Sequence, residues 1–141
     1  MNRLLTVVEV VSQASLEIGI TLRPITTIID TLDQDIAQMT ALLSLVADDV
    51  LQDEPYKTQL NTDWCAGADN VVKAYPTADT DRVMFDGRLA INGLKFRFLK
   101  AKGLEYGEEE RDFTIRMNKL AADANGRVLD LNDDSDGGRV V

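Results

Sequence analysis

The sequence contains no histidine and only one cysteine among its 141 residues. Without an imidazole, the chain has neither a Ser-His-Asp or Cys-His catalytic group nor a histidine metal ligand. A single thiol excludes an internal disulfide and a thiolate zinc site, so we expect a reducing, intracellular setting. Enzymes that use carboxylates, lysine or tyrosine stay open, and so do proteins that only bind.

Long apolar runs are also missing. The N-terminal apolar stretch from Leu4 to Val11 is interrupted by Glu9 and followed by Gln13, and no small-residue cleavage site comes after it. We therefore do not predict a signal peptide. No uninterrupted apolar run approaches the ~18 residues of a membrane span. The sequence predicts a soluble protein that is made in the cytoplasm.

Acidic residues outnumber basic ones by 24 to 15, which gives a formal net charge of -9. This excess is uneven: residues 1–81 hold 13 acidic and 4 basic residues, and residues 103–141 hold 10 acidic and 5 basic residues. Residues 82–102, in contrast, hold one acidic and six basic residues. An acidic body thus contains one basic segment. Because a net negative surface repels phosphate, the molecule as a whole is a poor candidate for nucleic-acid binding.

Apolar residues three and four positions apart predict two helices in the first half of the chain. The first ends at Gly19, a plausible C-cap, and a linker containing Pro24 follows it. The second is capped by Asp30 or Thr31 and ends before Pro55. The apolar stripe of the first helix consists of Leu4, Val7, Val8, Val11, Ala14 and Ile18, and the heptad stripe of the second consists of Leu32, Ile36, Met39, Leu43, Val46 and Val50.

Two more helices are predicted in the second half. One runs from Asp86 to about Lys102 and stops at Gly103, and its Gly93 would allow another backbone to approach closely. The other runs from Gly107 to about Ala124, where Asn125-Gly126 ends it. Their apolar stripes are Ala90, Ile91, Leu94, Phe98 and Ala101 in the first of the two, and Phe113, Met117, Leu120, Ala121 and Ala124 in the second.

The remaining segments lack helical periodicity. Within the irregular region 56–85, we expect one short strand through Val71, Val72 and Tyr75. Residues 127–141 cannot bury themselves and are expected to form a flexible arm. The predicted fold is mainly α: a small bundle of about four helices over residues 1–126, with the irregular insert and an extended C-terminal arm.

Three local patterns have a chemical interpretation and a simpler one. Asn132, Asp134, Asp136 and Gly137 match the opening of an EF-hand loop, but the glutamate at loop position twelve is missing, so we favour a solvated acidic tail. The run Glu108–Glu110 could hold a raised-pKa acid, but acids at a helix N-terminus explain it more simply. Cys65 after Trp64 has no histidine and few cations nearby to lower the pKa of its thiol, which favours a buried apolar cysteine.

The basic helix allows two interpretations. Arg88, Lys95 and Lys102 fall seven positions apart and share one face, while Arg97 and Lys100 lie on other sides. These side chains could form a phosphate-binding stripe. Alternatively, they pair with the acidic body of this chain or of a neighbouring copy, which is the more economical account because the rest of the chain is net negative.

The segment from Gly93 to Glu109, GLKFRFLKAKGLEYGEE, resembles the signature of the head-to-tail adaptor proteins of tailed bacteriophages. In that family an apolar, aromatic and basic helix ends in Lys-Gly-Leu-acid-Tyr, and acidic residues and another helix follow. The resemblance is specific over residues 86–118, loose over 1–55 and absent over 56–81. Phe96 stands where the family has tryptophan, and Gly107 where it has alanine. An aromatic residue expected near the end of the second helix is missing unless Tyr56 takes its place.

This resemblance implies a helical subunit of a ring, usually of twelve copies, at the head–tail junction of the virion. The ring would sit under the portal protein, extend the DNA channel without binding DNA specifically, and receive tail or neck proteins. No enzymatic activity, cofactor, metal or membrane is implied. For portal docking we expect Arg127, Leu129, Leu131, Arg139, Val140 and Val141; for contacts between subunits we expect Arg88, Lys95, Arg97, Lys100 and Lys102 with Glu108, Glu109 and Glu110.

Three other functions remain open at this point. A DNA-binding phage regulator would use the basic helix 86–102 to contact phosphates. Within the phage interpretation, a tail-completion or tail-terminator role is the nearest alternative, and the sequence alone separates it poorly. A carboxylate-based hydrolase would need two acids converging in a cleft, and the sequence shows no such pair.

Overall fold

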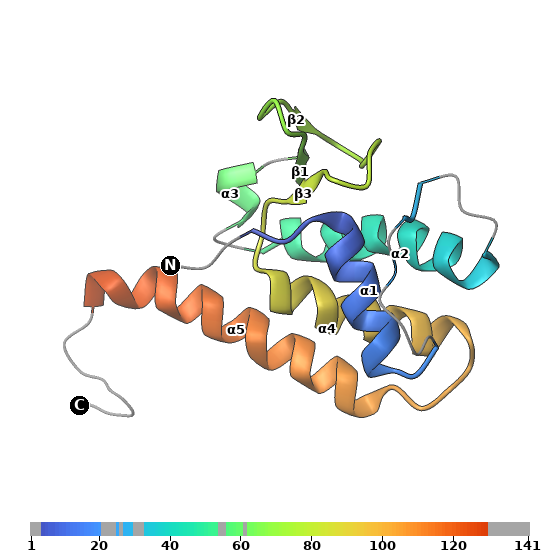
Figure 1. Cartoon of the computed structure of the whole chain (residues 1–141). Coiled ribbons are helices and arrows are strands. Elements are labelled where there is room, and N and C mark those ends of the chain that lie inside the picture. Colours follow the sequence, from blue (N-terminus) through green and yellow to red (C-terminus); the bar gives the residue numbers. More distant parts are fainter. Residues whose placement is uncertain are drawn as a thin grey trace.

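A computed structural model describes residues 4–20, 25, 27–29, 33–53, 56–60 and 62–129. Helix α4 lies between α1 and α2 on one side and α5 on the other, and a small sheet lies on the side of the helices away from α5 (Figure 1). The predicted mainly α class is confirmed. In chain order the elements are α1 (Val7–Glu17), α2 (Gln34–Leu51), α3 (Tyr56–Leu60), β1 (Cys65–Ala66), β2 (Val72–Lys73), β3 (Arg82–Val83), α4 (Gly87–Ala101) and α5 (Gly107–Leu129).

Helix α1 begins and ends through local hydrogen bonds. Thr6 accepts a hydrogen bond from the Glu9 amide, and the Glu9 carboxylate accepts one from the Thr6 amide, which makes a capping box. Gly19, just past the end of the helix, has a φ of +80°, a left-handed conformation that favours glycine. The predicted end of this helix is thus confirmed. Many of its apolar residues are β-branched, so the burial of its stripe, rather than helix propensity, stabilises it.

Helix α2 carries the predicted heptad stripe into the core, but its cap differs from the prediction. Asp33, not Asp30 or Thr31, caps the helix: its carboxylate accepts hydrogen bonds from the amides of Asp35 and Ile36. The sequence offers several capping residues in a row, and periodicity fixes a helix start only to within a turn. Leu32 lies outside the described residues. The rest of the stripe is buried: Ile36, Met39, Leu43, Val46 and Val50.

Helix α4 is the centre of the core, because α1, α2 and α5 all pack against it. Gly93 lies where two of these partners meet it. A Cβ atom at Gly93 would lie 2.6 Å from Cγ1 of Val46 in α2 and 2.9 Å from Cε1 of Phe113 in α5. The prediction of a close approach at Gly93 is correct in part: the groups that approach are side chains of α2 and α5 and not another backbone. Ala101, which was expected on the buried face, is exposed instead, because it ends α4 in the solvent-exposed turn 100–105.

The sheet comes from the region that was expected to be irregular with one strand. Its order is β2-β1-β3, and β1 pairs antiparallel with both neighbours. The strand predicted through Val71, Val72 and Tyr75 is only Val72–Lys73, and Tyr75 lies beyond it. Strands of two residues and the five-residue α3 are too short to show periodicity, which is why β1, β3 and α3 escaped prediction.

The sheet is attached to the helices at its β3 side. Thr6 forms an isolated bridge with Arg82, and the Val83 amide donates to the Leu5 carbonyl at 2.8 Å. The buried carboxylate of Asp81 holds the adjoining loop, accepting hydrogen bonds from Lys73 Nζ at 2.8 Å and the Thr77 amide at 2.7 Å. Burial raises the pKa of Asp81, but these hydrogen bonds outweigh it and lower the pKa. The loop before β3 is therefore fixed by a charged group.

Helix α5 is longer than predicted. It runs to Leu129, through Asn125 and Gly126, which were expected to end it. Asn and Gly lower helix propensity, Gly by roughly 1 kcal/mol relative to Ala, but they do not forbid a helix as proline does. The predicted boundary of the C-terminal arm at residue 127 is therefore wrong, since Arg127 and Leu129 belong to the helix. Residues 130–141 lie outside the described part.

Asp86 joins three helices at the start of α4. Its carboxylate caps α4 by accepting from the Leu89 amide, and it accepts two hydrogen bonds of 2.9 Å from Arg116 of α5. The Asp86 amide donates to the hydroxyl of Tyr56 in α3 at 3.1 Å. Burial raises the pKa of Asp86, but the hydrogen bonds from Arg116 and Leu89 reverse this and lower it. Asp86 is thus ionised at neutral pH, and both of its carboxylate oxygens accept hydrogen bonds within the fold.

Replacing Gly93 tests the packing of α4. Gly93→Ala should lower the free energy of unfolding by about 1–3 kcal/mol, because the new methyl group collides with Val46 and Phe113 in a filled core. Urea denaturation followed by circular dichroism measures the change. Gly107→Ala is the matched control: its Cβ would meet only the flexible carboxylate of Glu105, at 3.1 Å. Equal stability of the two variants would contradict the role given to Gly93.

Replacing Asp86 tests the junction of α3, α4 and α5. Asp86→Ala should cost about 2–4 kcal/mol of the free energy of unfolding, since it removes a helix cap and leaves Arg116 without its partner. Arg116→Gln, which spares the cap, should cost less in the same urea titration. If Arg116→Gln lowered the free energy of unfolding more than Asp86→Ala does, the stabilising role given to the cap would be contradicted.

Candidate functional site

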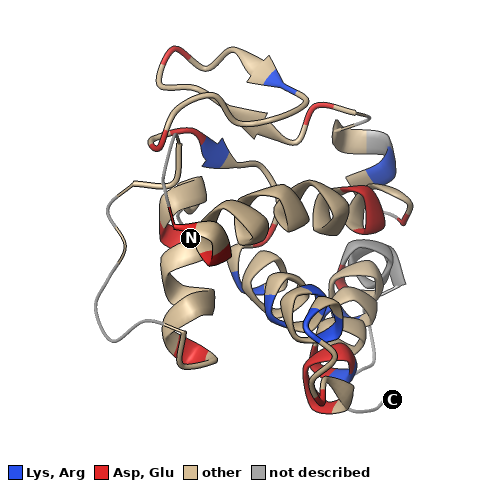
Figure 2. Cartoon of the chain, turned by 90° about the vertical axis from the view of Figure 1, so that its right-hand side faces the viewer, with Lys and Arg blue, Asp and Glu red and all other residues tan. Residues whose placement is uncertain are grey.

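The bases of α4 face acidic residues of the neighbouring helices. Arg88 and Lys95 both bind Glu17 at the end of α1: Nη1 of Arg88 lies 3.0 Å from each carboxylate oxygen, and Nζ of Lys95 lies 2.7 Å from Oε1. In the ribbon of Figure 2, lysine and arginine positions are blue, and several of them lie along α4. Two cations therefore share one carboxylate at this point on the surface.

Glu17 is strongly affected by these neighbours. Partial burial raises its pKa, but hydrogen bonds from Lys95, Gln13 and Arg88 outweigh the burial and lower the pKa to about 2. Glu17 therefore stays ionised throughout the physiological range. It joins the end of α1 to two positions of α4 that lie about two turns apart.

Two further bases of α4 pair with α2. Arg97 donates from Nε to Asp49 at 3.0 Å, and Lys102 lies 3.2 Å from Asp35. The interpretation that the basic segment pairs with the acidic body of this chain is therefore confirmed for Arg88, Lys95, Arg97 and Lys102. The sequence could not show which acids they meet, because Glu17, Asp35 and Asp49 lie 48 to 78 positions away from the bases they bind.

Lys100 differs from the other bases of α4. Within the described residues it has no carboxylate partner, and its Nζ lies 5.7 Å from the centre of the Phe96 ring and 5.9 Å from that of Tyr106. Phe96 also packs against Phe113. Next to this cluster, Leu104 is 55% exposed. We call the group Phe96, Lys100, Leu104 and Tyr106 the α4–α5 corner.

The glutamates 108–110 at the start of α5 form no ion pair with the bases of α4 in the described part of the chain. Glu108 and Glu110 are exposed and Glu109 is half-buried, and none of the three forms an ion pair with a described residue. They lie in the first turn of α5, where acids stabilise the positive end of the helix. The pairing of these glutamates with the bases of another subunit stays a prediction.

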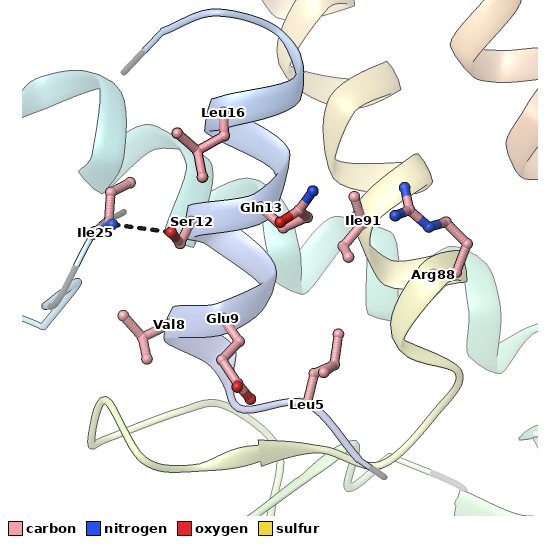
Figure 3. A pocket seen from close by; sticks show the side chains of 9 residues that line it. All are labelled: Leu5, Val8, Glu9, Ser12, Gln13, Leu16, Ile25, Arg88 and Ile91. Atoms are coloured by element: carbon pink, nitrogen blue, oxygen red, sulfur yellow. Dashed lines mark hydrogen bonds between the residues drawn. The ribbon is translucent and has the colours of Figure 1, made fainter. Parts of the chain in front are cut away.

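A groove runs between α1 and the first half of α4 (Figure 3). Its volume is about 500 Å³. The Ser12 hydroxyl in its wall accepts a hydrogen bond from the Ile25 amide at 2.9 Å, and Gln13 donates to Glu17 at 2.7 Å. Sequence periodicity did not reveal this groove, since its two walls come from helices about 70 positions apart. Its lining is mostly apolar: Leu5, Val8, Leu16, Ile25 and Ile91, with Glu9, Ser12, Gln13 and Arg88.

The described residues offer little for catalysis or metal binding. Among them, no group of three acidic or thiol side chains could hold a metal ion. Cys65 is buried, and burial raises the pKa of its thiol to about 11, so it is not a thiolate at neutral pH. The predicted buried, unreactive cysteine is confirmed. In the same part of the chain, no helix is long and apolar enough to cross a membrane.

The residues predicted for portal docking lie mostly beyond the described part. Arg127 and Leu129 are in the last turn of α5, whereas Leu131, Arg139, Val140 and Val141 are outside the described residues. The EF-hand-like residues Asn132 to Gly137 are outside as well. The docking role of this segment therefore stays a prediction.

Compared with known proteins, the chain matches no family model, no curated protein and no solved structure. The functional assignment therefore depends on the residues and their arrangement.

The ion pairs of Glu17 can be tested by their dependence on pH. Glu17→Gln should lower the free energy of unfolding by about 1 kcal/mol at pH 6, because both ion pairs of the carboxylate are lost. A group with a lowered folded-state pKa stabilises the fold above its ordinary pKa of 4.5, and this contribution disappears as the pH falls toward 2. The difference between wild type and variant should therefore shrink between pH 4.5 and pH 2. A difference that is constant over this range would contradict the lowered pKa.

Proposed function

We propose that the chain is a structural protein of a tailed-phage neck, which forms a ring that joins the portal of the head to the tail and extends the DNA channel. The observation that carries the proposal is the position of the adaptor-like segment 93–109. It forms the second half of α4, the turn at Gly103 and the start of α5, and it begins at the glycine where α2, α4 and α5 meet. The first part of this segment, Gly93 to Phe98, thus lies in the core where α2, α4 and α5 meet, and the rest forms the exposed turn that leads into α5.

The carboxylates of the described residues support binding rather than acid–base catalysis. Four of them have a lowered pKa, and each of the four is held by an ion pair or by backbone amides: Glu17, Asp79, Asp81 and Asp86. A carboxylic acid that donates a proton near neutral pH needs a raised pKa instead. These groups therefore contribute to the fold and its surface charge.

The charge arrangement favours an adaptor over a DNA-binding regulator. Four of the five bases on α4 are neutralised by acids of α1 and α2, so a phosphate would have to compete with existing ion pairs. Protein–DNA affinity comes largely from bases that release counterions from DNA. A net charge of -9 repels the backbone of DNA, which suits a channel through which DNA moves without being held.

The proposal is tested by electron microscopy of the protein mixed with its portal. The expected result is a ring stacked beneath the portal. A ring at the far end of a tail would indicate a tail terminator instead, and a chain that never assembles would contradict the proposal. Titration with duplex DNA distinguishes an adaptor from a DNA-binding regulator. An adaptor should bind little DNA at ~0.15 M salt, whereas a regulator should bind DNA with an affinity that falls steeply as the salt concentration rises.

The α4–α5 corner provides a variant for the same experiment. Lys100→Glu should reduce the fraction of portals that carry a ring by about tenfold, because it places an acid at the one base of α4 that has no carboxylate partner in the described part. Lys95 and Lys102 are unsuitable, since reversing them would disrupt ion pairs within the fold. Lys57→Glu on α3 is the control and should assemble normally. If both variants assembled equally well, the α4–α5 corner would not be part of the contacts between subunits.

A further inference from the structure

Besides the α4–α5 corner, two apolar surfaces of the described chain are left uncovered. The first is the groove between α1 and α4. The second, which we call the β2 edge, lies at the outer strand of the sheet and comprises Asp69, Val71, Val72 and Tyr75. The exposed fractions of its three apolar side chains are 57% for Val71, 49% for Val72 and 64% for Tyr75. Contiguous exposed apolar side chains of this kind are typical of interaction sites.

The two surfaces are separated within one molecule. Strand β3 is bridged to Thr6 at the start of α1, and β1 lies between β3 and β2. The β2 edge is therefore the side of the sheet farthest from α1, where the groove begins. It is also held in place, since Asp81 binds Lys73 of β2 and the amides of the loop that follows. The β2 edge does not cover the groove of its own chain.

The electrostatics of the groove favour an occupant that combines apolar and acidic side chains. Arg88 and Lys95 share the single carboxylate of Glu17, which leaves positive charge in excess at this rim. The side chain of Arg88 is 44% exposed. Toward the described residues its hydrogen bonds use Nη1 alone, whereas a guanidinium has five N–H donors, so donors remain for a second carboxylate. At the other end, the carboxylate of Glu9 is engaged by the Thr6 amide.

The β2 edge has the complementary composition. Its three exposed apolar side chains lie next to the exposed Asp69, and residues 62–82 together hold four acidic and two basic residues. We propose that the β2 edge of one copy docks into the α1–α4 groove of the next copy, with Asp69 close to Arg88. Such a contact joins two different surfaces, so it repeats head to tail and closes into a ring when the rotation permits. This inference rests on the proposed ring and assigns the surfaces that build it.

Cysteine cross-linking tests the contact directly. A chain that carries both Gln13→Cys in the groove and Val72→Cys on the β2 edge should form a ladder of disulfide-linked oligomers on mild oxidation. A mixture of the two single variants should stop at dimers. The native Cys65 is buried with a raised thiol pKa, so it should not react. The control pair, Gln13→Cys with Ile115→Cys, places the second thiol on exposed α5 and should give no ladder. An equal ladder from both pairs would overturn the proposal.

Charge exchange provides a second, independent test. Arg88→Glu and Asp69→Arg should each reduce assembly about tenfold, because like charges then meet in every contact. Arg88→Glu also loses the exposed ion pair with Glu17, so recovery in a mixture, and not the loss alone, tests the contact. An equimolar mixture of the two variants should regain assembly, since alternating copies restore opposite charges at each contact. Circular dichroism establishes that each variant folds, and Asp69→Asn, which keeps the side-chain oxygen that binds the Val71 amide, checks for loss of that turn. Failure of the mixture to assemble, with both variants folded, would overturn the pairing.

These outcomes are separable from those of the proposed function. Rings beneath the portal without cross-linking or charge rescue would contradict the docking contact and leave the adaptor function intact. Cross-linked ladders from a protein that never binds the portal would support the contact and contradict the adaptor function.

Discussion

The absence of a side chain at Gly93 is the constraint on which the rest of the fold depends. Helix α4 contacts α1, α2 and α5, and at Gly93 the space of a single methyl group is taken from one side by Val46 and from the other by Phe113. A larger residue there would push α2 or α5 away from α4. The ion pairs between these helices need the same spacing, since Arg97 reaches Asp49 only while α2 and α4 are in close contact. Packing thus positions the charges.

The charges, in turn, decide what the surface has left for a partner. A net charge of -9 suggests a molecule that repels itself, yet the acids of α1 and α2 lie where the bases of α4 neutralise them. Most of the basic residues of α4 therefore form ion pairs within the molecule. What remains uncovered is mostly apolar: the α1–α4 groove, the β2 edge and the α4–α5 corner around Lys100. A protein with three such surfaces and satisfied internal charges is suited to assembly.

Function as an assembly component also fits the chemistry of the ionisable groups. The shifted carboxylates are held in the ionised state, and burial holds the thiol of Cys65 in its neutral state. None of these groups is poised to transfer a proton near neutral pH. The tight hydrogen bonding of Asp81 and Asp86 keeps the sheet and the start of α4 in fixed positions, and a subunit that must present the same surfaces to every neighbour needs that rigidity.

The sequence by itself determined the helices and much of the core, because apolar periodicity and capping residues act over a few neighbouring positions. The stripes of α1 and α2, the stripe of α4 apart from Ala101, and the stop at Gly19 were predictable for this reason. Local signals were insufficient where the sequence preference was weak. Asn125-Gly126 did not end α5, and of the capping residues near the start of α2 it was Asp33 that capped the helix. Only the tertiary structure decided that Glu17 serves two bases, that three short strands form a sheet, and that a groove opens beside α1. Each of these depends on residues far apart in the chain, whose meeting is set by packing and not by local propensity.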